Sequence, residues 1–135
     1  MKNWKWLFNS YENAGVYSVA AVFPKDAVEK AAIQCGLSFQ QIDLHKVADK
    51  KSLLTAICGA LNFPDYLGMN WDALNDCLTD MSWKPSAGYA LLFTGLRTFS
   101  KSKPEDMHVL REIFSSATQY WKQKKVPFFI VISAN

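Results

Sequence analysis

Four aspartates stand close together in a segment that carries no positive charge. Between Leu61 and Trp83 the sequence holds four carboxylates and neither lysine nor arginine. Three of these residues, Asp72, Asp76 and Asp80, recur at every fourth position, so a continuous helix would align them in one stripe. Like charges at this spacing destabilise an isolated helix by roughly 0.2–0.5 kcal/mol per pair. Unpaired carboxylates in a row are typical of a surface that receives a cationic partner.

The residues around this stripe predict how it is held. Asn70 is a favourable N-cap, and it predicts a helix over residues 70–81. The apolar residues of the segment recur at helical spacing and predict a face against the core, made of Trp71, Leu74, Cys77 and Leu78. An exposed aromatic on the preceding turn would serve as an anchor for the partner. The predicted partner-binding residues are Tyr66, Asp72, Asn75, Asp76, Thr79 and Asp80.

The rest of the sequence shows no pattern typical of catalysis. His45 and His108 are isolated, and no metal-ligand spacing, glycine-rich phosphate loop or nucleophile elbow occurs. Cys35, Cys58 and Cys77 are an odd number without a Cys-x-x-Cys spacing, so we expect reduced, apolar side chains. We therefore expect a protein that is not an enzyme and that needs no cofactor and no metal.

One metal-dependent interpretation remains open at this stage. Asp72 and Asp76 could approach a single Mg²⁺ ion, which would make the chain a divalent-metal or nucleotide-binding domain. Hard cations take more oxygen ligands than two exposed aspartates supply, and a phosphate loop is missing. A melting temperature that rises with millimolar Mg²⁺ or Ca²⁺ would favour this interpretation.

Length and composition predict one compact domain over residues 1–135. Half of the 135 residues are hydrophobic and 20% are charged, which excludes a disordered or low-complexity chain. No apolar run reaches the roughly 18 residues of a membrane helix, and no signal peptide is recognisable, so we expect a cytoplasmic protein without a membrane partner. The net charge is +3, but lysines such as Lys122 and Lys124 close a predicted helix, and we expect no nucleic-acid partner.

Apolar runs alternate with helical periods along the chain. This order predicts an α/β fold with a three- to four-stranded, mainly parallel sheet and covering helices. The first 15 residues fit no element clearly, and we expect Trp4, Trp6, Leu7 and Phe8 to pack on an outer surface. Residues 100–103 are expected to form a loop. The predicted strands are 16–23, 39–44, 89–93 and 128–132, and the predicted helices are 25–35, 50–61, 70–81 and 104–124.

The segment around the aspartates also closely resembles a known pattern. Residues 63–79 read FPDYLGMNWDALNDCLT. They resemble the signature of the barstar family of intracellular ribonuclease inhibitors, which is an aromatic or Leu, Pro, an acid, an aromatic, x, Gly, x, Asn, x, Asp-Ala-Leu, x, Asp-Cys-Leu. The likeness spans residues 38–133 as the family core, and residues 1–36 resemble the N-terminal strand–helix extension of longer bacterial members.

The resemblance implies a function and a role for individual residues. Members of the family block a ribonuclease active site with a helix and loop whose carboxylates stand in for RNA phosphates. The resemblance implies that this chain is a stoichiometric inhibitor of a basic ribonuclease or of a ribonuclease-type toxin. If the target is a toxin, the chain is expected to be an immunity protein. We expect it to be monomeric before it binds. Asp76 falls on the principal inhibitory aspartate and Asp72 on a second one, and Tyr66 and Thr79 fall on contacting residues.

Three positions depart from the family pattern. Asn75 stands where the family has an interfacial tryptophan, Asp80 stands where it has glycine, and Ser116 stands at the position of a contacting glutamate. These differences imply a target other than the one bound by the family's namesake. The alternative is an α/β interaction module that keeps the fold without inhibitory activity.

Overall fold

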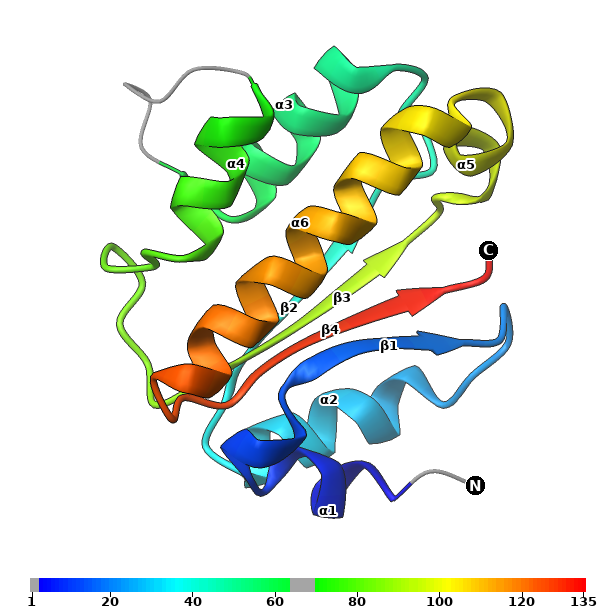
Figure 1. Ribbon diagram of the computed structural model, residues 1–135. Helices are drawn as coiled ribbons and strands as arrows, with labels where there is room; N and C mark the ends of the chain where they lie inside the picture. The colour runs from blue at the N-terminus through cyan, green and yellow to red at the C-terminus, as the bar shows by residue number, and fades with distance from the viewer. Residues whose placement is uncertain (1–2, 64–69) are drawn as a thin grey trace.

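The chain folds around a four-stranded sheet in which every strand is parallel to its neighbours (Figure 1). The computed structural model describes residues 3–63 and 70–135. The order of the strands across the sheet is β1-β4-β3-β2, which confirms the α/β class with a mainly parallel sheet. The strands are β1 (Gly15–Val19), β2 (Ser38–Asp43), β3 (Tyr89–Thr94) and β4 (Phe128–Ser133).

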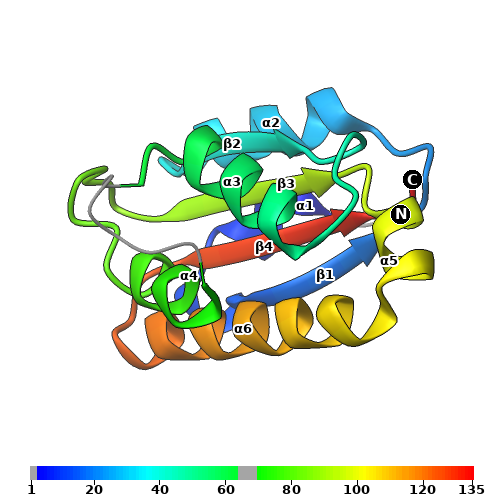
Figure 2. The same cartoon turned by 90° about the horizontal axis from the view of Figure 1, so that it is seen from above.

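Helices cover both faces of this sheet and create two cores (Figures 1 and 2). Strand β3 has no exposed residue, as expected for a parallel strand between two helical layers. Its alternate residues serve the two cores: Leu91 and Phe93 face α3, α4 and α6, whereas Ala90 and Leu92 face α1 and α2. The helices are α1 (Trp4–Phe8), α2 (Lys25–Gln34), α3 (Lys50–Ala60), α4 (Trp71–Leu78), α5 (Arg97–Ser102) and α6 (Pro104–Gln123), and a 3-10 turn spans Tyr11–Asn13.

The N-terminal strand is shorter than predicted. Strand β1 ends at Val19 and does not continue to Phe23, because Val19 already pairs with Ser133, the last residue of β4. Beyond that point the chain has no neighbour in the sheet, and Val22 is 93% exposed. The apolar residues of the sequence continue to Phe23, but strand β4, with which they would have to pair, ends at Ser133.

Two short helices were not predicted. In α1, Trp4, Leu7 and Phe8 are buried against α2 and β4, but Trp6 is 67% exposed, so the expectation that it packs is wrong. The expected loop over residues 100–103 is mostly helical, because α5 runs to Ser102. The fully buried side chain of Phe99 anchors this helix to the core.

The two long helices begin where their capping residues predict. Asp49 accepts a hydrogen bond from the Ser52 backbone at 2.8 Å, and the Ser52 hydroxyl accepts one from the backbone of Asp49, forming a capping box for α3. Pro104 is the first residue of α6, where its missing N–H leaves no donor unsatisfied. Within the described residues, no helix is long and apolar enough to cross a membrane.

Candidate functional site

Helix α4 carries the predicted aspartates and is fixed at both ends. The side chain of Asn70 accepts a hydrogen bond from the Ala73 backbone at 2.7 Å, which confirms the predicted N-cap. At the other end, the indole of Trp121 on α6 donates to the carbonyl of Leu78 at 2.7 Å. Leu74, Leu78 and Cys77 are almost completely buried, so one side of α4 belongs to the core.

The segments that flank α4 are tied to each other. Phe63 and Trp83 form an edge-to-face ring contact with centroids 5.3 Å apart. The indole of Trp83 also donates to the carbonyl of Leu61 at 3.2 Å. These contacts join the end of α3 to the turn after α4, so the outer side of α4 is presented on a rigid base.

Removing the N-cap is expected to weaken this presentation. We expect Asn70→Ala to lower the free energy of unfolding by about 1 kcal/mol, because the loss of an N-cap side chain costs roughly 0.5–2 kcal/mol. Urea unfolding of the two proteins measures the difference. Asn70→Asp should restore most of it, since aspartate is an equally good cap; equal stability of the wild type and Asn70→Ala would show that the cap contributes nothing.

The outer side of α4 presents Asp72 and Asp76, both exposed and one helical turn apart. The helix ends at Leu78, however, and not near Met81 as predicted, so Asp80 does not continue the stripe. Met81 is 1% exposed and takes a left-handed backbone conformation with φ 54°, which turns the chain back into the core. Asp80 therefore lies in a turn, exposed, with its carboxylate accepting a hydrogen bond from Ser82 at 3.2 Å.

Two uncharged residues of the predicted surface, Asn75 and Thr79, are half-buried. The hydroxyl of Thr79 donates to the carbonyl of Asn75 at 2.9 Å and to that of Asp76 at 3.3 Å, so it satisfies carbonyls at the end of α4. The structure thus places Asp72, Asn75 and Asp76 on α4, Thr79 at its C-cap and Asp80 in the turn that follows. The predicted anchor Tyr66 lies outside the described residues.

The carboxylates of this surface have no basic partner among the residues described. Over residues 3–63 and 70–135 the ion pairs are His45 with Asp43 and His108 with Glu112, and none involves Asp72, Asp76 or Asp80. One cation does lie at the rim, because the Lys50 ammonium sits 5.3 Å from the centroid of the Trp71 ring. Asp72, Asp76 and Asp80 are exposed and form no ion pair with any described residue, so their negative field is directed to solvent.

A groove between α4 and α6 adds a carboxylate that the sequence reasoning missed. This α4–α6 groove has a volume of about 320 Å³. Glu112 lies one helical turn before Ser116 on α6 and is 66% exposed, and its carboxylate is 2.9 Å from the His108 ring. The resemblance marks the position of Ser116, and Glu112 lies four residues before it on the same helix. This spacing is the signal that would have identified Glu112. The groove is lined by Trp71, Asp72, Asn75, Val109, Glu112, Ile113 and Ser116.

Cys77 lies on the buried side of α4 and its thiol is held protonated. Burial, together with smaller contributions from the Cys58 thiol and the carboxylates of Asp76 and Asp80, raises the pKa of Cys77 to about 12. Burial also raises the pKa of Cys58. All three cysteines, including half-buried Cys35, are free thiols.

Cys77 is buried and Cys35 is only half-buried, and this difference in burial predicts that the two thiols react at different rates. At pH 8 only about one Cys77 side chain in ten thousand is a thiolate, so an alkylating reagent is expected to modify Cys35 first and to leave Cys77 intact in the folded protein. Mass spectrometry after timed alkylation measures the order, with urea-unfolded protein as the control in which all three react. Modification of Cys77 as fast as Cys35 would contradict its burial.

A metal centre finds no support in the part of the chain that the structure describes. No group of three or more His, Cys, Asp or Glu side chains there is arranged to hold a metal ion. Asp72 and Asp76 are the pair considered for Mg²⁺, and two carboxylates fall short of the six oxygens that such an ion prefers. Asp72 and Asp76 are exposed on α4 and give its outer side a negative charge.

Comparison with known proteins supplies the family. A search of curated proteins finds no match for the chain. A protein-family model described as Barstar (barnase inhibitor) matches residues 37–133, well over half of the chain. The matched region contains β2, β3, β4 and all of α4, whereas β1 and α2 precede it. The chain belongs to the barstar family.

Proposed function

We propose that this protein is a stoichiometric inhibitor of a basic ribonuclease and blocks the active site of that enzyme with the outer side of α4. The observation that carries the proposal is the pair Asp72 and Asp76, which is exposed on a capped helix and has no lysine or arginine partner among the described residues. In a family of ribonuclease inhibitors, such carboxylates are suited to occupy the positions of RNA phosphates.

The residues of the surface have distinct roles in this proposal. Asp76, central on the surface, pairs with cations of the catalytic cleft, and Asp72 pairs with a second group one turn away. Thr79 and Asn75 offer short polar side chains beside them, and Asp80 extends the negative field past the helix end. Tyr66, on the segment before α4, is proposed as the aromatic anchor.

The departures from the family pattern bear on which ribonuclease is bound. Asn75 is smaller than the family's tryptophan and leaves the α4–α6 groove open, and Ser116 provides no charge there. Glu112 lines the same groove and offers a carboxylate one turn away. We propose that the target carries a cation placed to reach Glu112. We propose that the target is a toxin of the producing cell, whose cytoplasm the inhibitor protects as an immunity protein.

The test is an inhibition assay with charge-neutral variants. The double variant Asp72→Asn with Asp76→Asn keeps the shape of α4 and removes both charges. We expect the wild type to abolish RNA cleavage at an equimolar ratio with its ribonuclease and the double variant to require a large excess. Glu29→Gln on α2, on the other face of the sheet, is the matched control for charge and should inhibit like the wild type.

Two outcomes of this assay would reject the proposal. Equal inhibition by the wild type and the double variant would show that another surface binds the enzyme. Binding of the ribonuclease without loss of its activity would favour the alternative of an interaction module that has kept the fold alone.

Association is also expected to depend strongly on salt. The screening length shortens from about 30 Å at 0.01 M to about 10 Å at 0.1 M ionic strength, so attraction between the α4 carboxylates and a basic enzyme weakens over this range. We expect the association rate constant to fall at least about tenfold in stopped-flow measurements. The fall should be smaller for Asp72→Asn and unchanged for Glu29→Gln. A rate independent of salt would contradict electrostatic steering.

A further inference from the structure

A second hollow lies far from α4, where the parallel strands end. Because all four strands run in one direction, their carboxyl ends meet at a single edge of the sheet. Figure 1 shows this edge on the side of the C-terminus, with α4 on the opposite side of the molecule. The hollow has a volume of about 570 Å³, within the range of small-molecule sites. It is lined by Ala21, Phe23, Lys25, Gln41, Asp43, His45, Thr94, Gly95, Arg97, Thr98 and Asn135.

The sheet changes from apolar to polar at this edge. On the face toward α2, Leu92 and Val131 belong to the core. Thr94 follows Leu92 by two residues on β3, so a polar side chain lies on the same face where the strand ends. The residue that pairs with Thr94 on β2 is Asp43. A polar row at the carboxyl edge of a parallel sheet is the usual place for a ligand in open α/β folds.

Thr94 is the most informative residue of this row. It is only 7% exposed, yet it lines the hollow. Within the described part of the chain, its backbone carbonyl accepts from Leu44 at 2.8 Å, but its hydroxyl makes no hydrogen bond. No fully buried side-chain oxygen or nitrogen of the described residues lacks a hydrogen-bond partner, so the oxygen of this hydroxyl is open to solvent. The hydroxyl of Thr94 is therefore available to a molecule in the hollow.

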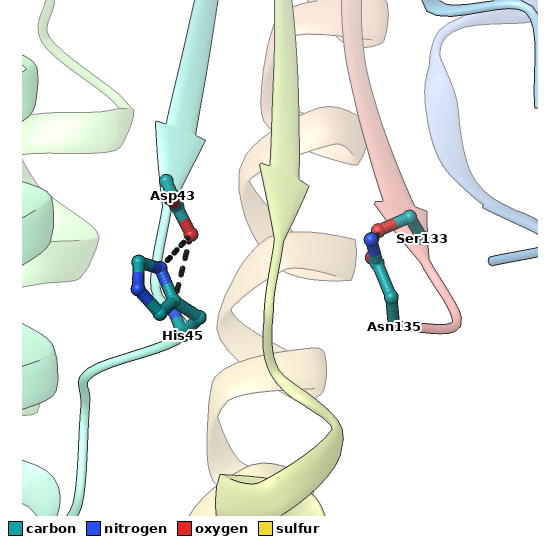
Figure 3. A network of polar contacts seen from close by, with 4 residues as sticks. All are labelled: Asp43, His45, Ser133 and Asn135. Atoms are coloured by element: carbon teal, nitrogen blue, oxygen red, sulfur yellow. Dashed lines mark hydrogen bonds and ion pairs between the residues drawn. The ribbon is translucent and has the colours of Figure 1, made fainter. Parts of the chain in front are cut away.

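The charges around the hollow favour an anion. Lys25 and Arg97 are exposed, and neither forms an ion pair with any residue that the structure describes. The carboxylate that lines the hollow belongs to Asp43 and is hydrogen-bonded to His45 (Figure 3). Its oxygen lies 2.8 Å from Nδ1 of the His45 ring and accepts a hydrogen bond from the His45 backbone N–H at 3.1 Å. These two hydrogen bonds lower the pKa of Asp43. Lys25 and Arg97 therefore form no ion pair in the part of the chain that the structure describes.

The loops around the hollow are fixed closely enough to form a site. Gly95 has φ +83°, and a Cβ atom there would lie 2.4 Å from the backbone nitrogen of His45, so only glycine allows this approach. On the other side of the hollow, Ser133, the last residue of β4, and Asn135 hydrogen-bond to each other (Figure 3). The backbone N–H of Arg97 donates to the main-chain oxygen of Asn135 at 3.2 Å, which joins the two sides.

From these observations we infer that the hollow binds a nucleoside monophosphate. Lys25 and Arg97 hold the phosphate group, which guanidinium and ammonium groups recognise well. The hydroxyls of Thr94 and Thr98 complete the polar contacts. Phe23 is half-buried and, with Ala21, gives the hollow an apolar wall against which a planar base can pack. This site is separate from the ribonuclease-binding surface and does not depend on it.

Isothermal titration calorimetry with three probes tests the inference on the full chain: AMP, inorganic phosphate and adenosine. We expect AMP to bind with one site per chain, inorganic phosphate to bind more weakly, and adenosine to bind most weakly. The double variant Lys25→Gln with Arg97→Gln should lose at least about tenfold in affinity for AMP. Lys30→Gln, an exposed lysine on the same helix, is the matched control and should bind AMP like the wild type.

Further variants separate this site from the rest of the molecule. Thr94→Val should weaken AMP binding, with thermal melting as the check that the variant folds, and Asp76→Ala should bind AMP unchanged. No heat of binding with millimolar AMP would overturn the inference, as would equal affinity of the wild type and the Lys25, Arg97 double variant. Inorganic phosphate that binds as tightly as AMP would overturn the assignment of a nucleotide.

Discussion

Asp76→Ala is expected to weaken binding to the target ribonuclease by on the order of 2–5 kcal/mol, because it leaves a desolvated cation of the enzyme without its partner. This corresponds to a loss of affinity of roughly thirtyfold to several thousandfold. Inhibition constants of the two proteins measure the difference. The dissociation rate should account for most of it, since Asp76 lies at the centre of the proposed interface and not at its rim.

The same substitution is expected to leave the free protein intact or slightly more stable. Asp76 is exposed and lies near the C-terminal end of α4, where the helix dipole does not favour a negative charge. Its removal relieves one unfavourable pair with Asp72 of roughly 0.2–0.5 kcal/mol and introduces the best helix former. Because Asp80 lies beyond the helix, only this one pair is relieved.

A matched variant separates the centre of the surface from its margin. Asp80→Ala removes the same charge from the turn after α4, and it should cost less affinity than Asp76→Ala. Unfolding of Asp76→Ala at the temperature of the assay would mean that the aspartate is structural. An unchanged inhibition constant would mean that α4 does not carry the interaction.

Leu74→Ala is expected to give the opposite result on the same helix. Leu74 is fully buried on the side of α4 that faces the core. Truncating a buried leucine to alanine costs roughly 2–5 kcal/mol of unfolding free energy. The carboxylates on the outer side are not altered. Thermal or urea unfolding should therefore show a large loss of stability, while the folded fraction retains most of its affinity for the ribonuclease.

The two variants together form a cross-test of the two sides of α4. Asp76→Ala should change affinity and spare stability, and Leu74→Ala should change stability and spare the affinity of the folded protein. Destabilisation of less than about 1 kcal/mol by Leu74→Ala would show that α4 is loosely packed on the core. A loosely packed helix would also present Asp72 and Asp76 in no fixed geometry.

Most of the fold could be predicted because its elements carry strong local patterns. The apolar strands β3 and β4, the capping box of α3 and the long amphipathic period of α6 each specify their element within a few residues. Helix α5 was missed because a six-residue helix with Phe99 as its buried anchor has too few residues to show a period. The end of β1 was missed because the end of its partner β4 determines it, and that partner lies at the other end of the chain.

The predicted surface was limited in a similar way. Local spacing identified Asp72 and Asp76, but the turn that follows α4 depends on Met81 entering the core, which spacing alone does not show. Glu112 is far from α4 in the sequence and reaches the α4–α6 groove only through the packing of α6. The hollow at the carboxyl edge gathers residues from the ends of four strands, and no sequence motif links Lys25, Thr94 and Arg97.

The most direct test of the central claim is a titration of the basic ribonuclease that the chain binds, followed by the rate of RNA cleavage. We expect the wild-type chain to stop cleavage at one molecule per enzyme and Asp76→Ala to reach the same inhibition only at a large molar excess. Cleavage that continues in the presence of excess wild-type chain, or that both proteins stop at the same ratio, would contradict the central claim.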